Sequence, residues 1–366
     1  MADPRPGFRE TDADLRVLVV RMSAAGDVVH GLPVVQALRA ARPEVHVGWL
    51  VEDRFAALLS CAKAADTVFV VPRRAARAWP LRRRLGALAA LRRRLIAARF
   101  HVALDLQGLT KSAAAAWAAR VPRRVGLARP DARELAPLLY TQRVSPGPER
   151  THVVDRNLAL LGALGLTSPA SGAARFPALD LHAPRVDAFL HDTELTHARF
   201  AVLNPGAGWP AKRWAPDRYA RLAAGLGRDQ GMASVVTWAG PAEEHLARTV
   251  VESGGESCIM APATDLAELW ALLGRAALFV GADTGPLHMA AAAGTRCVGL
   301  FGPTTGARNG PYGAGHRVLQ GHCPGQPGCW SRRGRRRCTC MRRIDPEAVL
   351  DACRRAITDS NAKDAV

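Results

Sequence analysis

Residues 15–41 read LRVLVVRMSAAGDVVHGLPVVQALRAA, and this stretch contains the repeating unit of the fold. The run 15–22 is apolar and rich in β-branched residues, as in a buried strand. A glycine-containing turn follows, and residues 27–41 have the apolar spacing of an amphipathic helix that ends before Pro43. The stretch therefore predicts a strand, a loop and a helix.

The same alternation recurs along both halves of the chain. Further strands are expected over 45–51, 67–71, 101–106, 200–204, 234–239, 277–282 and 296–301. Helices are expected over 53–64, 81–99, 216–227, 241–252, 265–275 and from about 285. Alternating elements of this length indicate parallel sheets covered by helices. The expected fold class is α/β, with two open parallel-sheet domains that bind ligands in a cleft at the carboxyl ends of their strands.

Composition shifts divide the chain further. We expect a flexible N-terminus over 1–14, a first α/β domain over 15–175, a linker over 176–199, a second α/β domain over 200–345 and a C-terminal helix and tail over 346–366. The second domain includes a Cys-rich loop at 321–343.

The overall composition is that of a globular protein. The chain has 366 residues, of which 48% are hydrophobic and 22% charged, enough for two buried cores. These proportions exclude collagen-like, coiled-coil and disordered proteins. No apolar run approaches the ~20 residues of a membrane span, and residues 1–16 lack the features of a secretory leader. We therefore expect a cytoplasmic protein.

The charge is strongly positive, at +18. Ten arginines lie between Arg73 and Arg99 with no Asp or Glu among them, which predicts a surface that faces anions. A solvated arginine face or a nucleic-acid site are the alternatives. Nucleic acid is disfavoured because the chain has only three Tyr and no recognisable nucleic-acid motif.

Polar motifs follow several predicted strands, and the first is SAAGDVVH at 23–30. Its Asp27 is placed either to cap the helix by accepting its free N–H groups or to act as a general base at the mouth of the cleft.

The second motif is GADTGPLH at 281–288. Backbone N–H groups at the start of a helix suit a diphosphate, although a plain turn with Pro in the first helical turn is the alternative. The sequence has neither G-x-G-x-x-G after a first strand nor a Walker A motif, which argues against a dinucleotide oxidoreductase and a P-loop NTPase.

Two more motifs follow strands of the second half. In NPGAGWPAKRW at 204–214, Gly206 allows close approach of the backbone to a ligand and Lys212 supplies a cation for phosphate, unless it is a solvated surface lysine. In WAGPAEE at 238–244, Glu243 could bind ribose hydroxyls or simply favour a helix start.

Four of the eight cysteines crowd into the Cys-rich loop, without the paired C-x-x-C spacing of a zinc ribbon. Unpaired structural thiols, a four-thiolate zinc or iron site and a disulfide pair are all consistent with this placement, and any metal there is expected to be structural. These cysteines are Cys323, Cys329, Cys338 and Cys340.

Together the polar motifs resemble glycosyltransferase family nine, the bacterial ADP-heptose transferases of lipopolysaccharide core synthesis. The resemblance covers nearly the whole chain and is most specific in GADTGPLHMAAAAGTRCVGLFGPT at 281–304. Within the family, the chain is most similar to the subgroup that adds the first heptose to Kdo on lipid A.

The resemblance implies a GT-B fold and inverting transfer without a catalytic metal or another cofactor. It implies ADP-L-glycero-D-manno-heptose as the donor and Kdo-lipid A as the acceptor. A monomer that is peripheral on the inner face of the inner membrane, with no nucleic-acid partner, is expected.

The resemblance also assigns residues. Asp27, on the first domain, matches the general base, and Lys212, on the second, matches the lysine that stabilises the departing diphosphate. The expected donor-binding residues are Gly206, Lys212, Glu243, Asp283, Thr284, Gly285 and His288. The expected acceptor-binding residues are Ser23, Gly26, Arg73, Arg74, Arg77, Gln107, Lys111 and Arg133.

The Cys-rich loop and Ala24, where a Ser is common, depart from this subgroup. The alternatives are a family-nine enzyme that adds a later core heptose or another glycan, a GT-B-type nucleotide-sugar epimerase and a non-catalytic ADP-binding protein.

Overall fold

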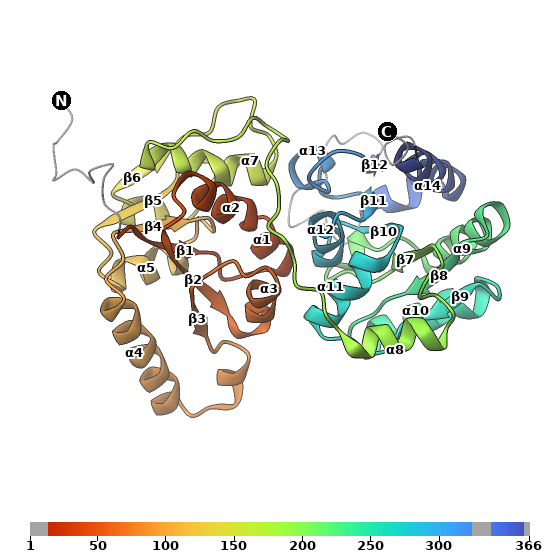
Figure 1. Ribbon diagram of the computed structural model, residues 1–366, viewed down its shortest axis with the longest axis horizontal. Coiled ribbons are helices and arrows are strands. Elements are labelled where there is room, and N and C mark those ends of the chain that lie inside the picture. Colours follow the sequence, from red (N-terminus) through yellow and green to blue (C-terminus); the bar gives the residue numbers. More distant parts are fainter. Residues whose placement is uncertain (1–13, 324–337, 362–366) are drawn as a thin grey trace. The chain divides into compact units, whose positions relative to one another are not determined.

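The computed structural model describes residues 14–323 and 338–361 (Figure 1). Contacts between residues divide the chain into two units. Of the described residues, unit 1 comprises 14–24, 31–150 and 154–170, and unit 2 comprises 25–30, 151–153, 171–323 and 338–361. Each unit contains one six-stranded parallel sheet with helices packed around it, which confirms the expected α/β class.

The sheet of unit 1 is built around β1, whose Val17, Leu18, Val19 and Val20 are fully buried. Val19 is paired with Trp49 on one side and with Leu104 on the other. The spatial order is β3 (Thr67–Val71), β2 (His46–Glu52), β1 (Arg16–Val20), β4 (Val102–Asp105), β5 (Arg123–Leu127) and β6 (Gln142–Val144).

The helices of the N-terminal half of the chain begin with the pair that follows β1, of which α1 groups with unit 2. They are α1 (Ala25–Val29), α2 (Leu32–Ala41), α3 (Ala56–Cys61), α4 (Leu81–Ala97), α5 (Thr110–Ala118), α6 (Ala136–Leu139) and α7 (Val153–Leu158). Short 3₁₀ turns are η1 (Asp53–Phe55), η2 (Ala75–Ala78) and η3 (Ala159–Leu164). Leu91 and Leu95 of α4 are buried in a cluster with Leu18, Leu50 and Phe69 of the sheet.

The single helix expected over 27–41 is instead two, α1 and α2, which are interrupted at His30 and Gly31. A Cβ at Gly31 would lie 2.9 Å from the Trp49 ring, so the chain passes close to the sheet there. Pro33 then stands in the first turn of α2, where its missing N–H costs nothing.

The sheet of unit 2 has the order β12 (Arg317–Gln320), β11 (Arg296–Phe301), β10 (Leu278–Ala282), β7 (Phe200–Asn204), β8 (Ala233–Val236) and β9 (Cys258–Met260). β7 and β10 are buried along their whole length, and both are apolar apart from Asn204 at the end of β7, as expected for interior strands of a parallel sheet.

Helices of unit 2 surround this sheet. They are α8 (Pro184–Asp192), α9 (Pro216–Gln230), α10 (Pro241–Ser253), α11 (Leu266–Arg275), α12 (Gly285–Ala292), α13 (Gly306–Asn309) and α14 (Pro346–Asn361), with 3₁₀ turns η4 (Pro210–Lys212) and η5 (Cys340–Arg343). Residues 176–199, expected as a linker, include α8, which contacts α11. Helix α14 packs on α9, where Gly225 leaves room for Leu350.

Among the described residues, no helix is both long enough and apolar enough to cross a membrane.

Candidate active site

Lys212 and Asp283 form a largely buried ion pair at the carboxyl end of the second sheet. Lys212 lies in η4, after β7, and Asp283 directly follows β10. The Lys212 Nζ donates to the Asp283 carboxylate Oδ2 at 2.7 Å and to its backbone carbonyl at 2.9 Å. The side chains are only 15% and 8% exposed, so Lys212 is not a solvated surface lysine.

His288 engages the other oxygen of the same carboxylate. Its Nε2 lies 3.3 Å from Asp283 Oδ1, and its ring is buried one turn into α12. Burial alone would raise the pKa of Asp283, but the hydrogen bonds and charges of His288 and Lys212 outweigh it and hold that pKa well below its usual range. Asp283 is therefore a carboxylate whose two oxygens orient Lys212 and His288.

The residues around Lys212 fix its loop. The ammonium lies 4.9 Å from the centre of the Trp209 ring, a cation–π distance. Trp214 is buried and donates its indole N–H to the Ile344 carbonyl at 3.0 Å. The K-x-W spacing thus anchors the loop through Trp214 while Lys212 faces Asp283.

The start of α12 lies beside this ion pair and leaves its first N–H groups without a side-chain cap from Thr284. Thr284 precedes the helix with extended backbone, and its hydroxyl donates to the Ala282 carbonyl at 3.3 Å rather than capping the helix. The first N–H groups of α12 thus receive no hydrogen bond from this side chain, and the positive end of the helix dipole lies beside Lys212's partner, Asp283.

Gly206, which follows β7, lies against Glu243 in the first turn of α10. A Cβ on Gly206 would lie 2.3 Å from the Glu243 carboxyl group, so a side chain at this position would displace that carboxyl group. Glu243 accepts a hydrogen bond from the Ala239 N–H at 3.1 Å. Burial raises the pKa of Glu243, partly offset by that N–H and by Arg213.

Helix α1, which carries Asp27, packs on α12 within unit 2. A Cβ on Gly26 would lie 2.4 Å from the His288 ring, and one on Gly285 would lie 3.0 Å from Ala25. Gly26, expected to bind acceptor, therefore serves this close helix contact. Asp27 is half-buried, and its segment groups with the unit that carries Lys212 rather than with the sheet that precedes it.

Sequence reasoning missed an aromatic cluster that extends from His288. The ring centroid of His30 lies 4.2 Å from that of His288 and 5.7 Å from that of His152, and His152 lies 4.9 Å from Tyr312. The His152 Nε2 also lies 3.0 Å from the Gly310 carbonyl oxygen. These residues are far apart in the chain, and no sequence spacing links them.

In unit 1, Glu52 pairs with two of the cationic residues expected to bind the acceptor, and the sequence did not point to it. Glu52, buried at the end of β2, accepts from Arg73 Nη1 and from Lys111 Nζ, each at 3.2 Å. Arg74 is held through its backbone, because its N–H and that of Ala75 donate to the Asp53 carboxylate. Arg73, Arg74 and Lys111 are thus fixed at the carboxyl ends of β2 and β3.

Two cavities meet at this position. One, of about 630 Å³, lies between α4, α5 and the ends of β1–β3 and is lined mainly by Leu, Val, Met and Ala side chains. The other, of about 320 Å³, is lined by Glu52, Arg54, Arg73, Arg74 and Arg77. They share Glu52, Arg73 and Arg77, so an apolar cavity continues into a cationic one.

The remaining acceptor candidates lie outside both linings. Gln107 accepts from the Met22 N–H at 2.8 Å, and its amide nitrogen lies 3.5 Å from the Ser23 hydroxyl. Arg133 is exposed, and its backbone N–H donates to Gly108. The structure brings Ser23 and Gln107 together but does not bring Arg133 to the cavities.

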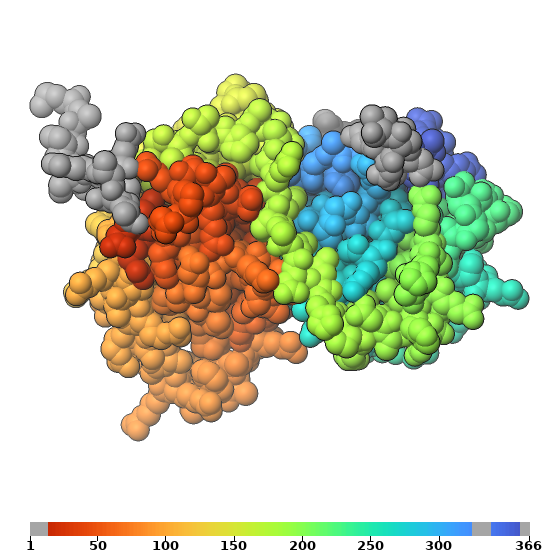
Figure 2. Space-filling view, viewed as in Figure 1, coloured from red at the N-terminus to blue at the C-terminus, as the bar shows by residue number. Residues whose placement is uncertain are grey.

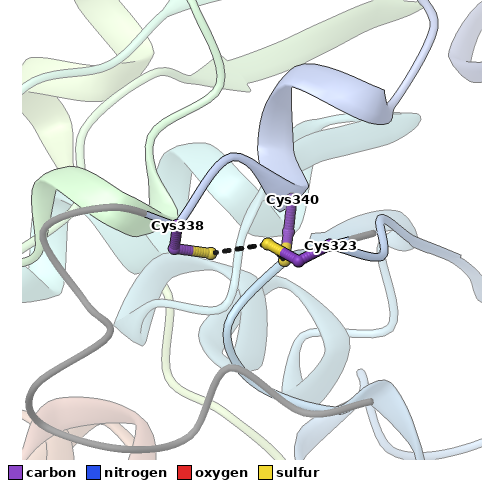
Figure 3. Close-up of side chains that lie close together, drawn as sticks. All are labelled: Cys323, Cys338 and Cys340. Atoms are coloured by element: carbon purple, nitrogen blue, oxygen red, sulfur yellow. Dashed lines mark hydrogen bonds between the residues drawn. The ribbon is translucent and has the colours of Figure 1, made fainter. Parts of the chain in front are cut away.

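The Cys-rich loop also forms a cluster, in which Cys323, Cys338 and Cys340 converge (Figure 3). Cys329 lies outside the described residues.

Known proteins with similar sequences include several heptosyltransferases. The model of glycosyltransferase family 9 (heptosyltransferase) matches residues 88–331. The lipopolysaccharide heptosyltransferase 1 of Salmonella typhimurium is 31% identical over 301 residues, which cover 82% of this chain and 92% of that protein. The protein of the same name from Pseudomonas aeruginosa is 30% identical, with 86% of each chain covered.

Solved structures of glycosyltransferases have a similar fold. E. coli heptosyltransferase WaaC with ADP has a TM-score of 0.75 and 27% identity, covering 93% of this chain and 100% of that one. A family 9 glycosyltransferase from Veillonella parvula has a TM-score of 0.81 at 22% identity, covering 96% and 99% of the two chains. These likenesses confirm the GT-B fold class. The chain therefore belongs to glycosyltransferase family 9 and is a glycosyltransferase.

Proposed function

We propose that this enzyme transfers a heptose from ADP-L-glycero-D-manno-heptose to Kdo of the lipopolysaccharide inner core, with inversion at the anomeric carbon and without a catalytic metal. The observation that carries the proposal is the Lys212–Asp283–His288 network at the start of α12. It supports a site for the diphosphate of a nucleotide sugar. Support for the sugar comes from the relatives named lipopolysaccharide heptosyltransferase 1 and from the structure of WaaC with ADP-2-deoxy-2-fluoro heptose.

On the donor side, the diphosphate accepts hydrogen bonds from the N–H groups at the start of α12. It also accepts a charge-assisted hydrogen bond from Lys212. Asp283 is too well paired to face phosphate, and its proposed role is to position Lys212 and His288. Glu243 binds the ribose hydroxyls, close to the glycine backbone at Gly206. As the anomeric C–O bond breaks, Lys212 stabilises the charge that grows on the leaving ADP.

On the acceptor side, Asp27 takes the proton from the attacking Kdo hydroxyl, which adds to the face of the sugar opposite ADP. A positioned base is needed because the neutral hydroxyl is a weak nucleophile. The packing of α1 on α12 supports this role, since it holds Asp27 in the same unit as the donor residues.

The paired cavities of unit 1 support an anionic amphiphile as acceptor. The cationic cavity suits Kdo carboxylates and lipid A phosphates, and the apolar cavity suits part of an acyl chain. Both open at the carboxyl ends of strands, where ligands bind in α/β sheets.

Helix α4 supports attachment to the cytoplasmic face of the inner membrane. Leu81, Leu85 and Leu88 lie on one face at helical spacing and are 68%, 57% and 50% exposed, beside the arginines of the same helix. Figure 2 shows this orange segment at the lower edge of unit 1. Exposed leucines flanked by arginines are typical of helices that lie on anionic membranes.

The decisive experiment is to incubate the enzyme with ADP-heptose and Kdo₂-lipid A and to measure the acceptor's mass. A gain of one heptose, with no divalent cation added, supports the proposal. Epimerised or hydrolysed donor without lipid would instead support an epimerase, and ADP binding without turnover would support a binding protein.

Neutralising Arg73, Arg74 and Arg77 to Gln together is expected to raise the acceptor KM about 100-fold, since each charge near an anionic surface contributes ~1 kcal/mol. Affinity for ADP should stay unchanged, because these residues belong to unit 1. Steady-state kinetics and ADP titration test both. Neutralising Arg221, Arg248 and Arg275 of unit 2 is the charge-matched control, and a fall in ADP affinity only in the first triple would reverse the assignment of acceptor and donor sites.

Replacing Leu81 and Leu85 by Ser is expected to weaken binding to vesicles containing anionic lipid at least ~10-fold, because each leucine that enters the membrane contributes over 1 kcal/mol. Transfer to deacylated, water-soluble acceptor should be unaffected. Leu138→Ser, at a leucine of α6 that is 73% exposed, is the control. Equal vesicle binding by the double variant and the wild type would rule out α4 as the membrane face.

A further inference from the structure

Three cysteine sulfurs converge between the last strand and the last helix of unit 2. Cys323 follows β12, and Cys340 begins η5. The Cys323 Sγ lies 2.9 Å from that of Cys340 and 3.8 Å from that of Cys338. All three sulfurs lie within 4.8 Å of one another, and Figure 3 shows Cys338 and Cys340 both directed at Cys323.

We propose that Cys323, Cys338 and Cys340 bind one thiophilic transition-metal cation, with zinc the expected occupant. Thiolates are the preferred ligands of zinc, and Zn–S bonds of ~2.3 Å in a tetrahedron place the sulfurs ~3.8 Å apart. The Cys323–Cys338 separation has this value, and the Cys323–Cys340 pair reaches it by opening about 1 Å. The fourth position falls to water or to a ligand outside these three.

A disulfide accounts for the arrangement less well. It would need two sulfurs at about 2.05 Å, and it would leave the third thiol of the group without a role. A cation engages all three at once. Each thiol that binds gives its proton to solvent, so binding releases protons and weakens as the pH falls.

The surroundings indicate a structural role, independent of the proposed transfer reaction. Gly321 lies against the backbone of Cys340, where a Cβ would be 2.2 Å from the carbonyl oxygen. A Cβ on Gly302, just after β11, would be 2.7 Å from the sulfur of Met341. Met341 and Ile344 belong to the core of unit 2. The cation would hold Cys323 and the segment 338–345 against this core.

Metal analysis of untagged protein, purified from cells grown with zinc, tests the site. We expect about one zinc per chain in the wild type and in Cys61→Ser, a control on α3 of unit 1. Cys338→Ser should lose nearly all of it, and its Tm should fall to that of the chelated wild type. Iron at the same stoichiometry, lost in the same variant, would equally support a thiolate cation site.

A second measurement does not depend on whether the variants fold. Demetallated wild type is titrated with Co²⁺, and a thiolate-to-cobalt charge-transfer band that saturates at one equivalent and is bleached by Zn²⁺ is expected. The proposal is overturned if the wild type neither carries nor takes up metal, or if Cys338→Ser binds it as tightly. A Cys323–Cys340 disulfide in metal-free wild type, seen by non-reducing peptide mass analysis, would also overturn it.

Discussion

Asp27→Asn is expected to lower the rate of heptose transfer about 10²–10⁴-fold, the usual contribution of a positioned general base. ADP affinity should stay within about twofold of wild type, because the carboxylate is assigned to the acceptor hydroxyl and not to the nucleotide. Single-turnover kinetics and ADP titration measure the two quantities separately.

The choice of Asn separates the two interpretations of Asp27. Helix α1 begins at Ala25, so Asp27 lies inside its first turn and supports the helix only through its charge, which contributes about 0.3–1 kcal/mol there. A residue with only that role would lose a little stability in Asp27→Asn and keep its transfer rate. Asn cannot accept the proton. Asp187→Asn, in the first turn of α8, is the matched control and should keep full activity. Wild-type-like turnover in Asp27→Asn would remove the base assignment.

Lys212→Ala is expected to lower kcat about 10²–10³-fold and to weaken ADP binding as well. In the proposed mechanism the ammonium contacts the diphosphate both before and during transfer, and in the structure it is held against Asp283. Kinetics with ADP-heptose and calorimetric titration with ADP check the two effects. Arg248→Ala, which removes an exposed ion pair with Glu244 on α10, is the control. Unchanged kcat and ADP affinity in Lys212→Ala would contradict the assignment.

The same substitution also affects stability, so the two effects must be separated. Removing one partner of a buried ion pair costs about 3–5 kcal/mol, because the other charge is left uncompensated. Since the pKa of Asp283 is depressed in the folded protein, its contribution to the free energy of unfolding is fully present above its unfolded pKa and is lost as the pH falls. In Lys212→Ala, the free energy of unfolding should therefore fall less between pH 7 and acid pH than it does in the wild type. Unfolding curves at pH 7 and at acid pH measure this, and kinetics are compared only where both proteins are folded.

Much of the fold is readable from the sequence because interior parallel strands are continuous apolar runs. β1, β7, β10 and β11 were predicted within a residue or two for this reason. β5 escaped prediction, since its first two residues are arginines and only the later ones are buried. The break between α1 and α2 also escaped, because it depends on the close approach of Gly31 to Trp49.

The sequence by itself determined which loops could carry the site, because glycine-rich turns after strands are local patterns. It pointed to Lys212, Asp283 and Glu243 in this way. Only the tertiary structure decided their partners: Lys212 meets a residue 71 positions away, and Glu52, at the end of an apolar strand, gathers Arg73 and Lys111. The packing of α1 on α12 and the convergence of three cysteines were decided there too. These contacts join side chains that sheet order and helix packing bring together. A local sequence pattern does not specify which distant residue will pack beside it.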